Sequence, residues 1–133
     1  MELTVQKFNA AIAKGDIHFD LRATAFNTLQ FEMHRDDQID TEFAKTMSIG
    51  TKNNWQLLTE HGELNRIIAK GTILVDAKAT APRTIEVAMY WEGSERAAWV
   101  KNVKMSQKSW DALLKPAPRY MTNGLPMRSS WYA

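Results

Sequence analysis

The chain of 133 residues contains no cysteine, which excludes disulfides, thiolate zinc sites, iron–sulfur clusters and cysteine nucleophiles. Glycine is scarce, and the six glycines are too dispersed to form a GxGxxG motif or a P-loop. Ser94 follows Gly93 but lacks the second glycine of a nucleophile elbow. From these absences we expect a protein without catalytic residues, without a cofactor and without enzymatic activity.

Long hydrophobic runs are also absent. The longest wholly apolar run spans residues 87–91, whereas a membrane helix needs about 20 apolar residues. The first residues show no charged-then-apolar signal segment. We therefore expect a soluble protein without a membrane partner, located in the cytoplasm, or in a virion if the protein is viral.

Charge is distributed unevenly along the chain, although the net charge is only +2. Residues 1–50 hold five basic and eight acidic side chains, whereas residues 97–133 hold six basic side chains and a single acid, Asp111. All five Phe lie in the first segment, between Phe8 and Phe43, and all five Trp lie from Trp55 onward. The sequence gives no sign of an internal repeat that would explain this shift.

The first half of the chain is expected to be helical. Apolar residues from Val5 to Ile12 have helical spacing, with Thr4 as cap and Gly15 as stop. Residues 21–34 fit both a strand alternation and a helical stripe at Leu21, Ala25, Leu29 and Met33, and the stripe favours a helix. Ile39, Phe43 and Met47 predict a further helix ending near Gly50, and residues 54–70 predict one that is bent at Gly62.

The second half changes to the two-residue period of strands. Residues 73–79 and 85–91 alternate, and the link at residues 81–83 has the chemistry of a turn. A polar stretch at residues 92–96 precedes a third apolar segment at residues 97–105. These patterns predict a three-stranded antiparallel meander at about 72–105, followed by a helix that Ser106 caps and Pro116 ends.

The expected fold class is therefore α+β, with a helical N-terminal half, the meander and a C-terminal helix. Residues 1–116 form a single globular domain in this reading. Residues 117–133 form an extended tail, because Pro116, Pro118, Gly124 and Pro126 break regular structure.

The densest polar cluster comprises Glu32, His34, Asp36, Asp37 and Asp40. Such side chains can bind a divalent metal or act as acid and base. However, residues at i, i+4 and i+8 of one helix cannot converge on one ion, because the outer two are about 12 Å apart along the axis. His18, His34 and His61 are scattered and form no ligand motif. We therefore expect these side chains to lie on the surface, with no metal site.

The tail is the strongest candidate for a functional segment. Its aromatic and apolar residues are of the types enriched in protein interfaces: Tyr120, Met121, Leu125, Met127, Trp131 and Tyr132. We expect a non-enzymatic assembly or interaction protein whose tail docks on its own domain, on another copy or on a protein partner. A virion component, a mobile-element accessory protein and an inhibitor all fit this class.

The alternative is a nucleic-acid-binding protein. In this reading the positive side chains of the C-terminal segment contact phosphates, and Tyr120 or Trp131 stacks on a base. The candidate residues are Lys101, Lys104, Lys108, Arg119 and Arg128. Against it, Trp99 and Trp110 are expected to belong to the core.

Overall fold

The computed structural model describes residues 2–36, 41–50 and 52–114. The elements follow in the order α1 (Glu2–Lys14), β1 (Ile17–Ala25), β2 (Thr28–Arg35), β3 (Phe43–Ser48), the 3-10 helix η1 (Lys52–Gly62), α2 (Glu63–Lys70), β4 (Ile73–Ala81), β5 (Thr84–Trp91), β6 (Trp99–Lys104) and α3 (Gln107–Leu114). Strands dominate both halves. The expectation of a helical N-terminal half is therefore wrong.

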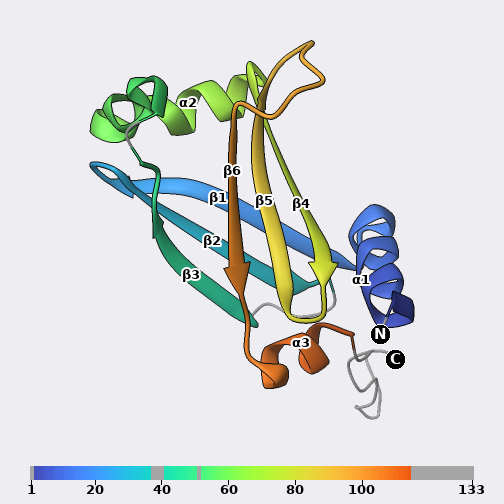
Figure 1. The fold of residues 1–133 in the computed structure, drawn as a ribbon. Coiled ribbons are helices and arrows are strands. Elements are labelled where there is room, and N and C mark those ends of the chain that lie inside the picture. The colour runs from blue at the N-terminus through green and yellow to red at the C-terminus, as the bar shows by residue number, and fades with distance from the viewer. Residues whose placement is uncertain (1, 37–40, 51, 115–133) are drawn as a thin grey trace, which may run out of the picture.

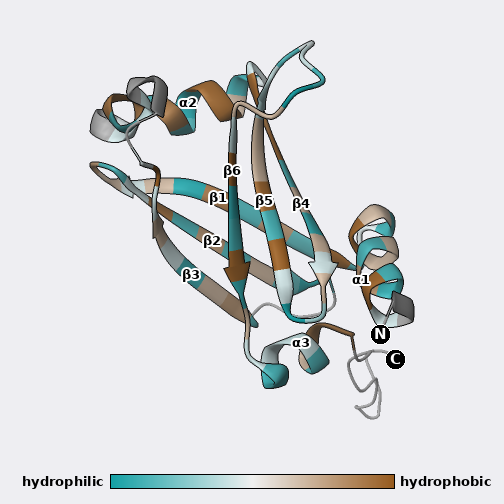
Figure 2. Ribbon diagram, in the orientation of Figure 1, coloured by the Kyte–Doolittle hydropathy of each residue, from teal (hydrophilic) through white to brown (hydrophobic). Residues whose placement is uncertain are grey.

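The strands form two antiparallel three-stranded sheets, sheet A with the order β1-β2-β3 and sheet B with the order β4-β5-β6. Figure 1 shows the two sheets lying one over the other with their strands crossing, and α1 lying beside β4. Alternate residues of each strand point into one shared hydrophobic core, which includes Phe31 and Met33 from sheet A and Val87 and Met89 from sheet B. Brown hydrophobic bands accordingly alternate with teal ones along the strands in Figure 2.

The chain is an internal duplication, in which each residue of the first half corresponds to the one 56 positions later. The two repeats share the order helix, strand, strand, strand. Between 9–35 and 65–91, twelve of 27 positions hold the same residue, among them Asn9 and Asn65, Gly15 and Gly71, and the Ala-Thr-Ala of 23–25 and 79–81. The expectation of no internal repeat is wrong.

Backbone hydrogen bonds repeat with the same spacing. Ile49 N–H donates to Asn27 O at 3.1 Å, and Met105 N–H donates to Arg83 O at 2.9 Å. The first hairpin of each repeat has a register shift at the equivalent position, between Ala23 and Ala25 in the first repeat and between Ala79 and Ala81 in the second. The two repeats therefore have the same strand register as well as the same strand order.

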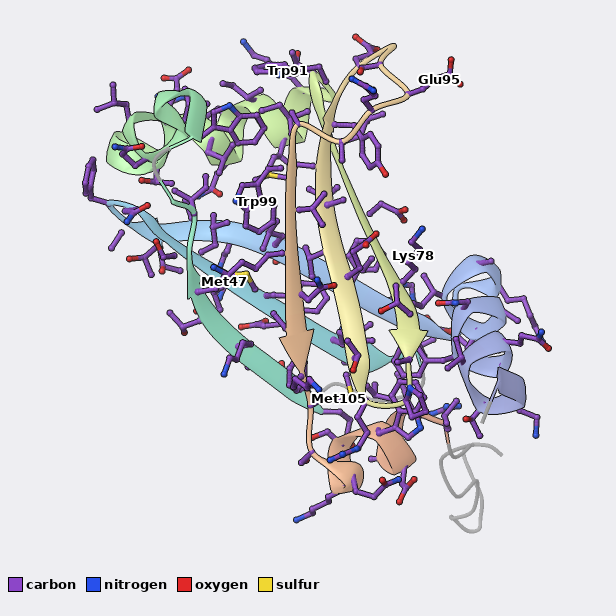
Figure 3. The ribbon with its side chains drawn as sticks, viewed as in Figure 1. Met47, Lys78, Trp91, Glu95, Trp99 and Met105 are labelled. Atoms are coloured by element: carbon purple, nitrogen blue, oxygen red, sulfur yellow. The ribbon has the colours of Figure 1, made fainter. Side chains whose placement is uncertain are left out.

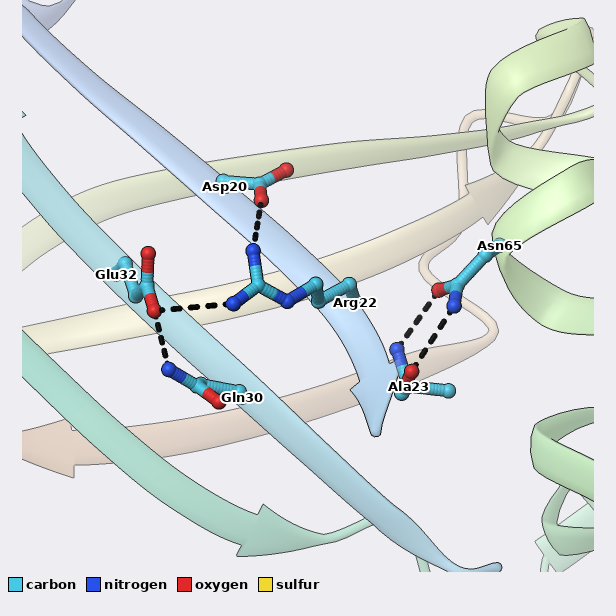
Figure 4. A network of polar contacts seen from close by, with 6 residues as sticks. All are labelled: Asp20, Arg22, Ala23, Gln30, Glu32 and Asn65. Atoms are coloured by element: carbon cyan, nitrogen blue, oxygen red, sulfur yellow. Dashed lines mark hydrogen bonds and ion pairs between the residues drawn. The ribbon is translucent and has the colours of Figure 1, made fainter. Parts of the chain in front are cut away.

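Two asparagines join the repeats across the interface between them. The Asn65 amide donates to Ala23 O at 2.9 Å and accepts from Ala23 N–H at 2.7 Å (Figure 4). Asn9 makes the equivalent pair with Ala79, at 3.0 Å and 2.7 Å. Each helix thus satisfies two backbone groups on the outer strand of the opposite repeat. We call these two contacts the asparagine clamps.

The helices also close the core between the repeats. Phe8 of α1 is fully buried, and its ring stacks on that of Trp110 of α3 with centroids 4.4 Å apart. Trp55 of η1 packs edge-on against Trp91 of β5 at 5.7 Å. The expectation that Trp99 and Trp110 belong to the core is confirmed.

The predicted helices at residues 21–34 and around Phe43 are strands because their apolar spacing fits both periods. A spacing of four residues keeps side chains on one face of a helix and also on one face of a strand. Leu21, Leu29 and Met33 are buried inner positions of β1 and β2. Phe43 and Met47 are likewise the inner positions of β3, and Ile39 lies outside the described residues.

Most of the other element boundaries agree with the sequence, but α1 begins at Glu2, so the expectation that Thr4 caps this helix is wrong. The three strands of sheet B lie within the predicted meander. Gly15 ends α1 with a positive φ of 87°, and η1 gives way to α2 at Gly62. The Ser106 hydroxyl accepts a hydrogen bond from Ser109 N–H at 3.1 Å and so caps α3. The expected tail at 117–133 lies outside the described residues.

Candidate functional site

The outward-facing side chains of sheet A are mainly polar. Arg22 lies between Asp20 at 3.5 Å and Glu32 at 3.4 Å, and Gln30 also donates to Glu32 (Figure 4). These contacts join β1 and β2 across the strands, and Asp20 and Arg22 are largely exposed. Surface ion pairs of this kind contribute little stability, so this face is a solvated one.

The outward face of sheet B carries an apolar patch. Leu74 of β4 lies opposite Tyr90 of β5, and Ala88 of β5 lies opposite Val100 of β6. Leu74 and Val100 remain 49% and 47% exposed. We call these four residues the sheet B patch. They lie toward the end of sheet B that carries Trp91 and Glu95, opposite the end that carries Met105 and α3 (Figure 3).

The duplication shows that the patch is not required by the fold. The residues of sheet A at the same positions are His18, Glu32, His34 and Ala44, three of them polar. Because both repeats build the same sheet, an apolar outer face is not needed for strand pairing. An apolar surface that only one repeat carries is the type of surface that binds a partner.

The acidic cluster lies on strand β2 and the residue after it, and not on a helix. The side chains of Glu32 and His34 project from the outer face of sheet A, and Asp36 accepts a hydrogen bond or ion pair from His18 Nε2 at 2.7 Å. Asp37 and Asp40 lie outside the described residues. Among the residues that the structure describes, no three metal-binding side chains gather around one point.

Two of the histidines that look scattered in the sequence are neighbours. His18 and His34 pair across β1 and β2, and their rings stack with centroids 5.3 Å apart. The expectation of a helix over residues 21–34 hid this pairing, which depends on the register of β1 and β2.

The lysines of the nucleic-acid hypothesis are exposed but do not share one face. Lys101 and Lys104 are three residues apart on β6, so they point to opposite sides of sheet B, and Lys108 lies on α3. The remaining candidates lie outside the described residues: Arg119, Tyr120, Met121, Leu125, Met127, Arg128, Trp131 and Tyr132.

The sheet B patch had a signal in the sequence. Strand β5 contains the uninterrupted apolar run of residues 87–91, in which Ala88 and Tyr90 occupy outward positions that a half-exposed strand normally gives to polar residues. That break in alternation marks an apolar outer face.

The structure contains no described helix long and apolar enough to cross a membrane. No protein-family model matches the chain, and neither the curated proteins nor the solved structures gave a significant match.

Proposed function

We propose that this protein is a non-enzymatic assembly protein in which the C-terminal segment of one copy binds the sheet B patch of the next. The observation that carries the proposal is the exposure of Leu74 and Val100 on an outer face whose counterpart in the first repeat is polar. Aromatic side chains and Met, the types that enrich interface cores, are concentrated in residues 117–133.

An exposed acid beside the sheet B patch can pair with the positive charge of the C-terminal segment. The segment from residue 115 onward holds Lys115, Arg119 and Arg128 and no acidic residue. Asp76 is exposed on β4 beside the patch, in register with Ala88. Opposite charges around an apolar centre favour one orientation of the bound segment.

The described part of the chain ends with Leu114 of α3, near the Met105 end of sheet B, whereas the sheet B patch lies toward the end at which Ile73 pairs with Trp91 (Figure 3). Binding of the C-terminal segment of one copy to the sheet B patch of the next joins two different surfaces, and such a head-to-tail contact generates rings or filaments.

Sedimentation velocity at increasing protein concentration tests this proposal. The full chain is expected to associate, and deletion of residues 117–133 is expected to leave a monomer. Val100→Glu places a charge in the patch and should weaken association by about tenfold or more, because it removes an apolar contact worth about 1.5 kcal/mol.

Ala44→Glu is the matched control, because Ala44 is the exposed equivalent of Val100 on sheet A. It adds the same charge and should associate as the unmodified chain does. A full chain that stays monomeric, or a truncated chain that associates as strongly as the full one, would contradict the proposal.

A further inference from the structure

The outer strands of the two sheets differ in whether their free edges are covered. The asparagine clamps cover β1 and β4 with helices of the opposite repeat. Strands β3 and β6 pair only with β2 and β5 within the described part of the chain. No strand among the residues that the structure describes pairs with their other edges. We call β3 and β6 the open edge strands.

The positive charge of the sheets is concentrated on the open edge strands. Together they hold Lys45, Lys101 and Lys104 and no acidic residue. The other four strands hold four acidic side chains and three basic ones, which nearly cancel. The open side of the molecule is thus the side suited to an anionic ligand.

Lys45 and Lys101 occupy the same position in the two repeats, at the centre of each open edge strand. Each shares its side of the strand with two buried residues, Phe43 and Met47 for Lys45, and Trp99 and Val103 for Lys101. Both lysines are nevertheless exposed. Neither forms an ion pair with any other residue in the described ranges.

Most other residues shared by the repeats have a role in the fold. Gly15 and Gly71 end helices with positive φ, Asn9 and Asn65 form the clamps, and the hydroxyls of Thr28 and Thr84 donate to the carbonyls of their own hairpin turns. Lys45 and Lys101 make no such contact with residues 2–36, 41–50 or 52–114. The structural role left to them is protection of an open edge, since an inward-facing charge discourages pairing with another strand.

The surroundings of Lys101 favour a ligand over edge protection alone. A hollow of about 320 Å³ lies against the start of β6 and is lined by Ile49, residues 97–100 and Lys101. Lys101 is a charged residue of this lining, and ammonium groups contact phosphate oxygens.

We propose that the open edge strands bind the phosphate backbone of a nucleic acid, with Lys45 and Lys101 each neutralising one phosphate. The hollow beside Lys101 shares Val100 with the sheet B patch, but the proposed site does not depend on residues 117–133. It replaces the sequence-based candidates Lys101, Lys104, Lys108, Arg119 and Arg128 with a pair that the duplication relates.

Fluorescence anisotropy of the full chain with an oligothymidylate of about 20 nucleotides, and with a duplex of the same length, tests the site. The double variant Lys45→Gln, Lys101→Gln should bind about tenfold more weakly at low salt. For the single strand, the slope of log affinity against log salt concentration should be shallower by about 1.4 for this variant than for the unmodified chain. Each phosphate contact contributes about 0.7 to that slope, and the variant removes two contacts.

The double variant Lys14→Gln, Lys70→Gln is the matched control. It removes the same charge from another pair of equivalent, exposed lysines, which end α1 and α2. It should bind as the unmodified chain does. Absence of binding by the unmodified chain, or equal weakening by both double variants, would overturn the proposal. Unchanged binding of the Lys45, Lys101 variant together with new self-association would show that these lysines only protect the edges.

Discussion

Replacing Phe8 with alanine is expected to lower the free energy of unfolding by about 3–5 kcal/mol. Phe8 is fully buried, and its ring is stacked on Trp110 at 4.4 Å, so the variant leaves a cavity and removes the stacking partner. A domain of this kind is stable by about 5–15 kcal/mol, so this single change removes a large share of the total. Urea denaturation followed by tryptophan fluorescence measures the loss.

Phe26→Ala is the control for Phe8→Ala, because Phe26 lies in the first hairpin turn and is 52% exposed. A surface substitution of this kind changes stability by about 0.5 kcal/mol or less. Leu64 is the equivalent of Phe8 in the second repeat and is also fully buried, so Leu64→Ala should cost about 2–5 kcal/mol. Equal stability of the Phe8→Ala and Phe26→Ala variants would contradict the packing described for α1.

Removal of either asparagine clamp is expected to lower the free energy of unfolding by about 2–4 kcal/mol, because each alanine variant leaves a backbone N–H and a carbonyl without partners. Asn65→Ala frees both groups of Ala23, and Asn9→Ala frees both groups of Ala79. The two clamps share no residue, so the double variant should lose about the sum of the two single losses. Urea titration of the single and double variants measures these values.

Asn102→Ala serves as the control for the clamps, because Asn102 is an exposed asparagine on β6 with no clamp contact. Asn102→Ala should lower the free energy of unfolding by about 0.5 kcal/mol or less. If Asn9→Ala and Asn65→Ala were as mild as Asn102→Ala, the helices would not be held by these amides. If only one of them were costly, the two repeats would not be joined symmetrically.

The residues of the two hairpin turns explain why the sequence predicted the second half better than the first. In the second hairpin, Pro82 marks the turn between β4 and β5. The equivalent turn at Phe26 and Asn27 contains neither glycine nor proline, although Asn27 adopts a positive φ of 60°, as Arg83 does at 62°. Without a turn signal, the spacing of Leu21, Leu29 and Met33 was compatible with one continuous helix.

The missing information was nevertheless present in the sequence. Aligning Ala-Lys-Gly at 13–15 with 69–71, and Ala-Thr-Ala at 23–25 with 79–81, transfers the clear strand pattern of β4 and β5 onto β1 and β2. The contacts between repeats could not be obtained in this way. Nothing in the local pattern shows that Asn65 reaches Ala23, because that contact depends on how the two sheets pack.

The candidate surfaces also differ in whether the sequence alone predicts them. The aromatic segment at 117–133 is visible in composition alone, whereas the sheet B patch needs the strand register that brings Leu74 beside Tyr90. Lys45 was not singled out at all, because its importance rests on its equivalence to Lys101. The sheet B patch and the Lys45–Lys101 pair are identified by comparing equivalent positions of the two repeats. The sequence predicts them only after the duplication has been recognised.

Cysteine cross-linking between copies tests the central claim most directly, since the natural chain contains no cysteine. One variant carries Ser130→Cys in the C-terminal segment, and the other carries Asn102→Cys on β6, beside the sheet B patch. We predict that oxidation of the mixture yields a disulfide-linked pair of the two variants. Thr46→Cys, at the equivalent exposed position of sheet A, should form little of this product. Equal cross-linking of Ser130→Cys with Asn102→Cys and with Thr46→Cys, or with neither, would contradict the account.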